Sequence, residues 1–587
     1  DAESSSTLRF FINVQGKTKL QTNLQSASLL PHYNTFEARA MRVVISDLPP
    51  EFSDEECETE DPVPVMNKPV APAPEAQEEE SAAPERTLVL SNGVVRVTLS
   101  SKGGAIRAVE LSAFRKTVEP DSGPLTMDFA AEPALALEGL PGAGARADYE
   151  LEAAGADTAR LTRRLGAGVT LTRTVRLLEH YGLRVTDAFV NEGSAAAAVP
   201  AHAVATGPMG VDDERMRERD SVYLGLDTLA AHGGEGVQHW TQSRFLRKSP
   251  LLALLAQPGV GPRAAHRVDD PVAWLAVKNK FFVQILTPPE DNLGFEVRAT
   301  RVADNRRQVL GAVSGAVRFG ERTLAPGDRW ERDLRGYIGP KDYALLRKLG
   351  GHYPEIMEFG RWFGWICKIL LPTLKGLHAV IPNYGVAIIL LTLIVRIIFW
   401  PVTHKSTESM KKMQALQPLV TKIREKYKDK PQKMNQEIMA LYKEHKVNPV
   451  SGCLPMLVQI PVFFALFTVL RSAVELRYAS FLWIRDLSEP EGLFAGTRLF
   501  QMLPLVSSLN ILPLLMTATT IWQQKLTPTS GDPQQQKMMM FMPIFMLFLF
   551  YNMASALVLY WTVSQVLSIV QMLWQQRRTG TAAPVVA

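Results

Sequence analysis

Hydrophobic and polar residues follow two different patterns on either side of residue 355. Before it, apolar and polar residues alternate in short runs such as TLVLSNGVVRVTL, which are bounded by Gly, Pro, Asn or Asp. Such alternation is typical of strands with one buried face. After it, long stretches without charged residues alternate with basic segments. The pattern predicts a β-rich domain followed by membrane-spanning helices.

Charge-free stretches locate the predicted spans. Residues 447–470, 499–524 and 538–576 contain 24, 26 and 39 uncharged residues. A 39-residue helix would measure about 58 Å, or roughly twice the hydrocarbon core of a bilayer, so we expect this stretch to turn back near residues 552–555. A further span contains a single charge, Arg396. The predicted transmembrane helices are 383–404, 449–473, 499–522, 538–552 and 555–575.

Basic residues set the expected orientation of these spans. Residues 405–446 carry eleven Lys and Arg, and other segments on the same side raise the total to fifteen, whereas the opposite side has four. Lys and Arg concentrate in cytoplasmic loops. This places residues 405–446 and the C-terminus in the cytoplasm, and the β-rich domain outside.

The region before the first span divides into four parts. Residues 87–345 contain many short strand-like runs, which favours an antiparallel β-sandwich with a hairpin turn at Asn92-Gly93. Residues 61–86 are rich in Pro, Ala and Glu, as an extended linker is. Residues 354–381 are amphipathic and aromatic-rich, and we expect them to form a helix that lies in the membrane interface. Residues 1–60 contain no apolar run typical of a signal or anchor and stay unassigned, as an incomplete or misread N-terminus.

Arg396 is the strongest functional signal, because a charge near the bilayer centre costs about 2.5 to 3.5 kcal/mol. A buried salt bridge would need Asp or Glu, and the five spans contain neither. Snorkelling to an interface and a hydrated cavity both stay open. Polar residues of the spans could line such a cavity, and the candidate groove consists of Arg396, Thr392, Gln459, Ser508, Thr517, Tyr560 and Ser564.

Residues 405–446 are interpreted as two amphipathic helices that form a cytoplasmic hairpin, with a break at Lys430-Pro431. Eleven basic residues against five acidic ones would suit contact with anionic lipid or ribosomal RNA, and a merely solvated face is the alternative. The candidate contact residues are Lys411, Lys412, Lys422, Arg424 and Lys426.

Composition argues against several other functions. A net charge of +5 is small for 587 residues, so uniform coating by nucleic acid is not indicated. Three distant cysteines form neither a disulfide framework nor a metal-ligand spacing, and the histidines of the β-rich domain stand singly. No GxxxxGK[ST] loop is present. We expect no catalytic residues, no metal and no cofactor.

The membrane region resembles the YidC-type insertases, the bacterial branch of the Oxa family of membrane-protein insertases. The matching segments are IVRIIFWPVTHKSTESMKKMQALQP, ALYKEHKVNPVSGCLPMLVQIPVFFALF, VELRYASFLWIRDLS, and KMMMFMPIFM followed by SALVLYWTVSQ. The resemblance implies a multidomain membrane protein with an all-α core of five transmembrane helices and a periplasmic antiparallel β-sandwich domain. It assigns Arg396, Thr392 and Gln459 to the family's groove and Tyr560 to a helix that contacts the inserting protein, while Trp561 stands where a second tyrosine is common.

The function implied by the resemblance is insertion and folding of newly made inner-membrane proteins through a hydrophilic groove open to cytoplasm and lipid, alone or with the Sec translocon. Expected partners are nascent membrane proteins, the Sec translocon, membrane lipids, and the ribosome, directly or through the nascent chain. The expected location is the cell inner membrane, with several spans, a large periplasmic domain and a cytoplasmic C-terminus. Two alternatives remain, a transporter of a small solute and a membrane-tethered sugar-active enzyme, which would need opposed half-helices and paired carboxylates respectively.

Overall fold

The computed structural model describes residues 13–14, 18–19, 84–211, 217–232, 236–245, 263–304, 307–445, 447, 454–495, 497, 508–526 and 533–579. The chain forms two compact units, residues 1–65 and 66–587. In the first unit, the described residues form two short paired strands, β1 (Asn13–Val14) and β2 (Thr18–Lys19), where the sequence predicted no element. Residues 61–83 of the predicted linker lie outside the described residues.

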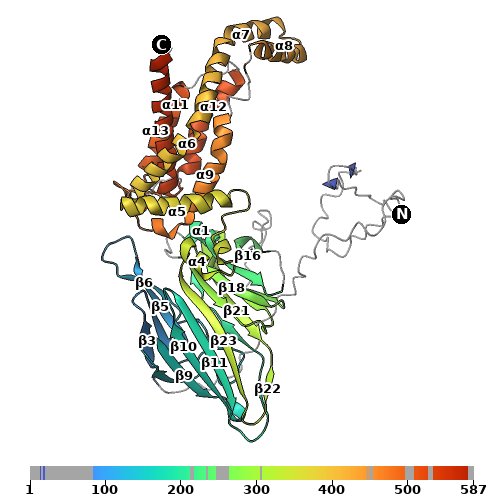
Figure 1. Ribbon diagram of the computed structural model, residues 1–587, viewed down its shortest axis with the longest axis vertical. Coiled ribbons are helices and arrows are strands. Elements are labelled where there is room, and N and C mark those ends of the chain that lie inside the picture. Colours follow the sequence, from blue (N-terminus) through green and yellow to red (C-terminus); the bar gives the residue numbers. More distant parts are fainter. Residues whose placement is uncertain are drawn as a thin grey trace, which may run out of the picture. The chain divides into compact units, whose positions relative to one another are not determined.

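The first part of the second unit is built from antiparallel strands (Figure 1). The largest sheet contains, in spatial order, β16 (Gln238–Thr241), β15 (Gly225–Ala230), β18 (Val272–Lys278), β19 (Phe282–Thr287), β23 (Arg329–Pro340), β11 (Gly182–Asn191), β10 (Val169–Leu177), β9 (Thr158–Arg164) and β8 (Glu150–Ala153). A second sheet contains β17 (Arg263–Val268), β20 (Phe295–Asp304), β21 (Arg307–Phe319), β13 (His202–Ala205) and β7 (Leu137–Glu138), with β14 (Met209–Gly210) also paired to β21. Smaller sheets join β3 (Thr87–Ser91), β4 (Val95–Ser100), β5 (Ala105–Arg115) and β6 (Pro124–Asp128), and β12 (Ala197–Val199) with β22 (Arg322–Leu324).

The two large sheets pack face to face through every second side chain of their strands. Strand β10 reads VTLTRTVRL, and every second side chain from Val169 to Leu177 is buried. From the other sheet, β21 packs against β15 and β18, and a Cβ at Gly315 would come within 2.6 Å of Leu226. This close approach leaves no room for a side chain. The predicted antiparallel sandwich is therefore confirmed.

The predicted hairpin at Asn92-Gly93 is also confirmed. It joins β3 to β4, which pair antiparallel. Gly93 has φ +83°, a backbone conformation that glycine adopts without steric cost. The Asn92 side-chain oxygen accepts hydrogen bonds from the backbone N–H groups of Val94 and Val95. The turn chemistry is thus local, and local chemistry is what a sequence motif can predict.

The second part of this unit is helical, apart from short helices within the sandwich. Those short helices are η4 (Gly166–Gly168), α1 (Arg217–Asp220), η6 (Ser221–Tyr223), α2 (Gln242–Phe245), α4 (Tyr343–Leu349) and η7 (Tyr353–Met357). The helical part contains α5 (Gly364–Val380), α6 (Tyr384–Ala415), α7 (Gln417–Lys426), α8 (Pro431–Glu444), α9 (Leu454–Ser472), η9 (Val474–Leu476), α11 (Ile511–Leu526), α12 (Pro533–Phe550) and α13 (Ser555–Thr579).

Helix α13 is central to the helical part, because it packs against α6, α9 and α11 (Figure 1). Within the described residues, Tyr384–Ala415 and Ser555–Gln575 are long and apolar enough to cross a membrane, by length and composition. Leu457–Ser472 and Met540–Phe550 are shorter apolar helices. Several apolar helices thus follow the sandwich, as the charge-free stretches indicated.

Several helix ends differ from the predicted boundaries. Helix α6 continues beyond residue 404 to Ala415, so the first half of the predicted hairpin extends the span without a break. Residues 354–381 do not form one helix, because Glu358 and Gly360 have positive φ angles and α5 starts only at Gly364. Helix α11 starts at Ile511, and residues 499–507 of the predicted span lie outside the described residues.

Candidate functional site

Arg396 contacts the neighbouring helix α13 from its position on α6. Its Nε donates to the Ser564 hydroxyl at 3.2 Å, and its Nη2 donates to the same hydroxyl and to the Ser564 carbonyl oxygen, both at 2.8 Å. The side chain is partly buried. Two residues on the same helix, Ile397 and Ile398, are 60% and 63% exposed, so the surface around Arg396 is apolar. The guanidinium is therefore held against α13.

Gln459 of α9 joins the same hydrogen-bonded group. Its Nε2 donates to the Tyr560 hydroxyl at 2.7 Å and lies 3.4 Å from the Ser564 hydroxyl. Tyr560 is buried, whereas Gln459 and Arg396 are partly exposed. Three helices, α6, α9 and α13, thus bring four of the seven predicted groove residues together.

This polar group contains no acidic side chain. Within the described part of the chain, no carboxylate lies within ion-pair distance of Arg396, and its hydrogen bonds use Nε and Nη2. A guanidinium has five N–H donors, and no described residue accepts from Nη1. The guanidinium of Arg396 is consequently hydrogen-bonded, but no described residue neutralises its charge.

The other three predicted groove residues are placed differently. The Thr392 hydroxyl donates to the Ile388 carbonyl of its own helix at 2.7 Å, and the Thr517 hydroxyl donates to Pro513 at 2.8 Å. Both side chains are buried. Ser508 precedes α11, and its carbonyl accepts from the Tyr551 hydroxyl at 2.9 Å. None of the three has a hydrogen bond to the Arg396 group within the described residues.

Polar residues continue along α13 toward its C-terminal end. The Ser568 hydroxyl donates to the Ser564 carbonyl at 3.0 Å, and Gln571 contacts the Thr403 hydroxyl of α6 at 3.4 Å. These contacts follow the four-residue spacing that the sequence shows from Tyr560 to Ser568. The interface of α6 with α13 is thus polar over several helical turns.

The predicted basic hairpin has its own small core. Leu416, Val420, Tyr442 and Val447 are buried together. Lys412, Lys422 and Lys426 are exposed and Arg424 is half-buried, while the side chain of Lys411 lies outside the described residues. Lys412 pairs with Glu408 at 3.2 Å, a surface pair of small energetic value. The side chains of Lys412, Lys422 and Lys426 therefore remain accessible to a partner.

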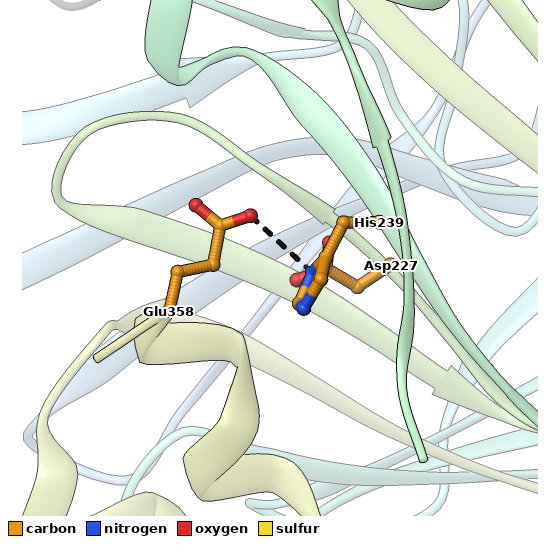
Figure 2. Close-up of side chains that lie close together, drawn as sticks. All are labelled: Asp227, His239 and Glu358. Atoms are coloured by element: carbon orange, nitrogen blue, oxygen red, sulfur yellow. Dashed lines mark hydrogen bonds and ion pairs between the residues drawn. The ribbon is translucent and has the colours of Figure 1, made fainter. Parts of the chain in front are cut away.

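A charged group in the sandwich includes His239, which the sequence presented as a single histidine. Figure 2 shows Asp227 and Glu358 on either side of its ring, with Nδ1 at 2.8 Å from Asp227 and 3.3 Å from Glu358. Three such ligands could bind a metal. However, the Lys278 ammonium already lies 2.5 Å from Asp227 and 3.1 Å from Glu358. These side chains therefore form an ion cluster that joins β15, β16 and β18 to the chain leading into α5.

Charge pairing in this cluster moves two pKa values. Burial favours neutral Lys278, but the charges of Asp227 and Glu358 outweigh it and raise the pKa of Lys278. Burial favours neutral Glu358, but Lys278 and His239 outweigh it and lower the pKa of Glu358. Both shifts favour a protonated Lys278 beside a deprotonated Glu358. Sequence spacing could not reveal this cluster, since Asp227 and Glu358 are far apart in the chain.

A second ion cluster is fully buried between the sheets. Asp187 accepts from Arg173 at 2.6 and 3.0 Å and from Arg332 at 2.7 Å. Arg332 also contacts His202 Nε2 at 2.7 Å, and Arg173 donates to two backbone carbonyls. Burial, followed by the charge of Arg332, lowers the pKa of His202 to about 4. This cluster is part of the core.

The segment between α9 and α11 supports the ends of several helices, a role that the sequence did not predict, although VELRYASFLWIRDLS within it carries part of the family resemblance. The Glu491 carboxylate accepts from the backbone N–H groups of Ile511 and Leu512, which caps α11. The Glu489 carbonyl accepts from Ser555 at the start of α13, and its carboxylate pairs with Lys280 of the sandwich at 2.5 Å. Acidic residues outside the spans gave the only signal, and that signal is common in loops.

Comparison with known proteins connects both parts of the chain to one family. A family model described as 60Kd inner membrane protein matches residues 376–582, and the YidC periplasmic domain matches residues 87–372. The membrane protein insertase YidC of Geobacter sulfurreducens is 34% identical over 499 residues, which cover 83% of this chain and 85% of that protein. The protein of the same name from Syntrophobacter fumaroxidans is 44% identical over 308 residues, or 52% of this chain and 54% of that protein.

A solved structure, described as an active YidC insertase with its first transmembrane domain resolved, is 20% identical and covers 85% of this chain and 94% of that chain, with a TM-score of 0.33. The family assignment rests on the sequence matches, which extend over the sandwich and the helical part alike. The chain therefore belongs to the YidC family of membrane protein insertases, which are inner-membrane proteins that act on nascent membrane proteins and are not enzymes.

Proposed function

We propose that the chain inserts its clients passively, along a hydrated groove formed by α6, α9 and α13 around Arg396. The observation that carries this proposal is the contact of Arg396 with Ser564, in a polar group that includes Gln459 and Tyr560 but no described carboxylate. A cation in such a place needs water or an incoming anion to offset its desolvation. The groove would supply the water, and an acidic client segment would supply the anion.

The direction of insertion would follow from the client's own hydrophobicity. Burying an apolar client segment in lipid releases free energy at about 25 cal/mol per Å², so no nucleotide is required. The barrier lies in moving the polar flank of the client across the hydrocarbon. Water held at Arg396, partway along α6, would shorten the distance over which that flank is unsolvated. Attraction by the guanidinium would further favour clients with acidic flanks.

The topology and partners of this mechanism are part of the proposal. Five spans, 383–404, 449–473, 499–522, 538–552 and 555–575, would place the α7–α8 hairpin and the C-terminus in the cytoplasm. Lys412, Lys422, Arg424 and Lys426, together with Lys411, would then meet the ribosome or anionic lipid. The chain would act alone or beside the Sec translocon. Support comes from the exposed basic hairpin and from the concentration of Lys and Arg on one side of the spans.

Insertion into proteoliposomes that contain only this protein tests the groove. The client is a single-span protein with a short acidic tail, compared with the same client carrying a neutral tail, and protease protection of the tail is measured. Arg396→Ala should lower insertion of the acidic client about tenfold, the equivalent of about 1.4 kcal/mol in the barrier, with less effect on the neutral client. Arg396→Lys should retain part of the activity, because it keeps the charge.

Thr562→Ala is the matched control, because Thr562 of α13 is buried and polar but its hydroxyl donates to the Val558 carbonyl of its own helix. It should insert both clients at the normal rate. Equal insertion of the acidic client by the Arg396→Ala and unaltered proteins would refute the electrostatic role of the groove.

A further inference from the structure

A tight turn between α9 and α11 exposes apolar side chains beside the start of α6. The backbone N–H of Phe481 donates to the Ile484 carbonyl and the N–H of Ile484 donates to the Phe481 carbonyl, both at 2.9 Å, so Leu482 and Trp483 form the tip. Leu482 is 74% exposed and Trp483 is 42% exposed. Residues 478–484 contain no charged side chain. An apolar tip of this kind needs a partner that removes it from water.

The backbone of this turn is unfavourable for the residue it carries. Leu482 has φ +54°, and in a two-residue hairpin this position normally holds glycine. Phe494, which is 63% exposed and precedes α11, has φ +58°. A bulky side chain in the left-handed region is strained, and such strain is characteristic of functional sites. Two strained residues in one segment both present apolar side chains outward.

Contacts with a membrane span fix the position of the tip. Phe481 packs against Gly385 in the first turn of α6, so closely that a Cβ at Gly385 would lie 2.1 Å from its ring. Ile484, at the other end of the turn, is buried. The tip therefore lies level with the outer end of α6, where a bilayer changes from headgroup to hydrocarbon.

The partners of Trp483 and Arg485 indicate an apolar environment for the tip of the turn and a polar environment just after it. The Trp483 Nε1–H donates to the Glu491 carboxylate at 3.1 Å, so its ring could enter an apolar layer without an unsatisfied donor. Tryptophan is enriched at this level of membrane proteins. Arg485 is exposed and pairs with Glu119 of the sandwich at 3.3 Å. Polarity thus changes across a few residues, as it does at a bilayer surface.

We propose that the Phe481–Ile484 turn and Phe494 insert into the outer-leaflet lipid and anchor the outer ends of α6 and α11. The partner is the boundary between headgroups and acyl chains, which accepts a leucine, an indole ring and a phenyl ring but not a cation. The strained backbone presents Leu482 to the lipid, and the glycine at position 385 makes room for the aromatic side chain that orients the turn.

Fluorescence quenching in nanodiscs tests this anchor on the full chain. The three native cysteines, Cys57, Cys367 and Cys453, are replaced, and single cysteines at positions 482 and 494 receive an NBD group. Lipids with a spin label high on the acyl chain should reduce emission from Leu482→Cys and Phe494→Cys by about half, as expected for groups a few ångströms below the headgroups. Discs with one protein copy exclude contact with a second copy.

Labels at two further positions show whether a negative result contradicts the proposed lipid anchor or the proposed membrane span of α6. Val89→Cys is the aqueous control, because Val89 of β3 is an apolar sandwich residue that is 54% exposed; it should not be quenched. Ile398→Cys on α6 should be quenched by spin labels deep in the bilayer. If Ile398→Cys is quenched but Leu482→Cys is not quenched, like Val89→Cys, the result contradicts insertion of the Phe481–Ile484 turn into lipid. It leaves the proposal that α6 spans the membrane intact. Quenching of Leu482→Cys only at two or more copies per disc would also overturn the proposal, in favour of a protein partner.

Discussion

Two arginine sites in this molecule meet the same physical problem in opposite ways. In the sandwich, Arg173 and Arg332 are fully buried and share the Asp187 carboxylate. In the helical part, Arg396 is partly buried, and among the described residues it donates hydrogen bonds to Ser564 alone. In the sandwich, the two guanidinium charges are paired with a carboxylate. In the helical part, no described residue neutralises the charge of Arg396.

The presence or absence of a carboxylate partner distinguishes an arginine whose charge stabilises the fold from one whose charge is available to a ligand. An arginine that is paired with a carboxylate exerts only a weak electrostatic attraction on a ligand, because the opposite charge within hydrogen-bond distance cancels most of its field. An arginine that is held by a hydroxyl and a carbonyl keeps its full charge and its orientation. Burial by itself therefore does not mark function in this protein. The function that we propose for Arg396 depends instead on burial without a neutralising partner among the described residues.

The largest effect is expected from breaking the sandwich cluster. Asp187→Asn keeps the shape of the side chain but removes the charge between two buried guanidinium groups, so the sandwich should lose about 3 to 5 kcal/mol of unfolding free energy. Urea unfolding of the full chain, followed by hydrogen exchange of β11 and β23, measures this loss.

Asp157→Asn is the matched control, because Asp157 pairs with Arg176 on the surface, with both side chains about half exposed. Its effect on the free energy of unfolding should be much smaller than that of Asp187→Asn, because an exposed ion pair contributes little to stability. A loss of similar size in both variants would show that the buried cluster has no special role in stability.

Acid should weaken the same cluster through His202. Its pKa is lowered to about 4 in the folded chain, against about 6.5 in an unfolded one, so the unfolded chain binds more protons between these values. Stability is therefore complete above pH 6.5 and falls as the pH decreases toward 4, by up to about 3 kcal/mol. Unfolding measured at several pH values should show a smaller slope in His202→Gln, which can still accept from Arg332. An unchanged slope would exclude His202 as its source.

The smallest effect on stability is expected at Arg396. Replacing this partly buried cation, which no described residue neutralises, with Met removes a desolvation cost and three hydrogen bonds, so the change should lie within about 1 kcal/mol of zero. Thermal unfolding of the helical part in detergent micelles measures it, in the same preparation used for insertion assays. Loss of several kcal/mol would place Arg396 with Arg173 as a structural residue, and the contrast between the two sites would disappear.

The predictable features of this molecule are the local ones. The Asn92-Gly93 turn follows from side-chain bonds within four residues. The polar spacing of Tyr560 and Ser564 was likewise visible in one helix, and both residues join the Arg396 group. Thr392 and Thr517 look equally polar in sequence, but threonine hydroxyls in helices commonly bond the carbonyl four residues earlier, and both do so here.

The features that escaped prediction depend on distant partners. His202 and His239 look isolated in the sequence, yet each contacts an ion cluster whose members come from separate elements of the chain. The exposed turn at Leu482 and the cap that Glu491 provides for α11 likewise depend on how the segment after α9 folds back. Residue spacing carries no information about such contacts, because the chain between the partners is long and its path is set by packing.

The sequence by itself determined the order of the regions, the alternation that makes a sandwich, the apolar helices and the presence of a charge with no acid in its own span. These follow from hydrophobicity and local hydrogen bonding, which act over a few residues. Only the tertiary structure decided which charges meet an opposite charge and which do not. Pairing depends on a few ångströms between side chains on different elements, as between Arg332 and Asp187, which are 145 residues apart, and burial of the surrounding apolar residues is what sets that distance.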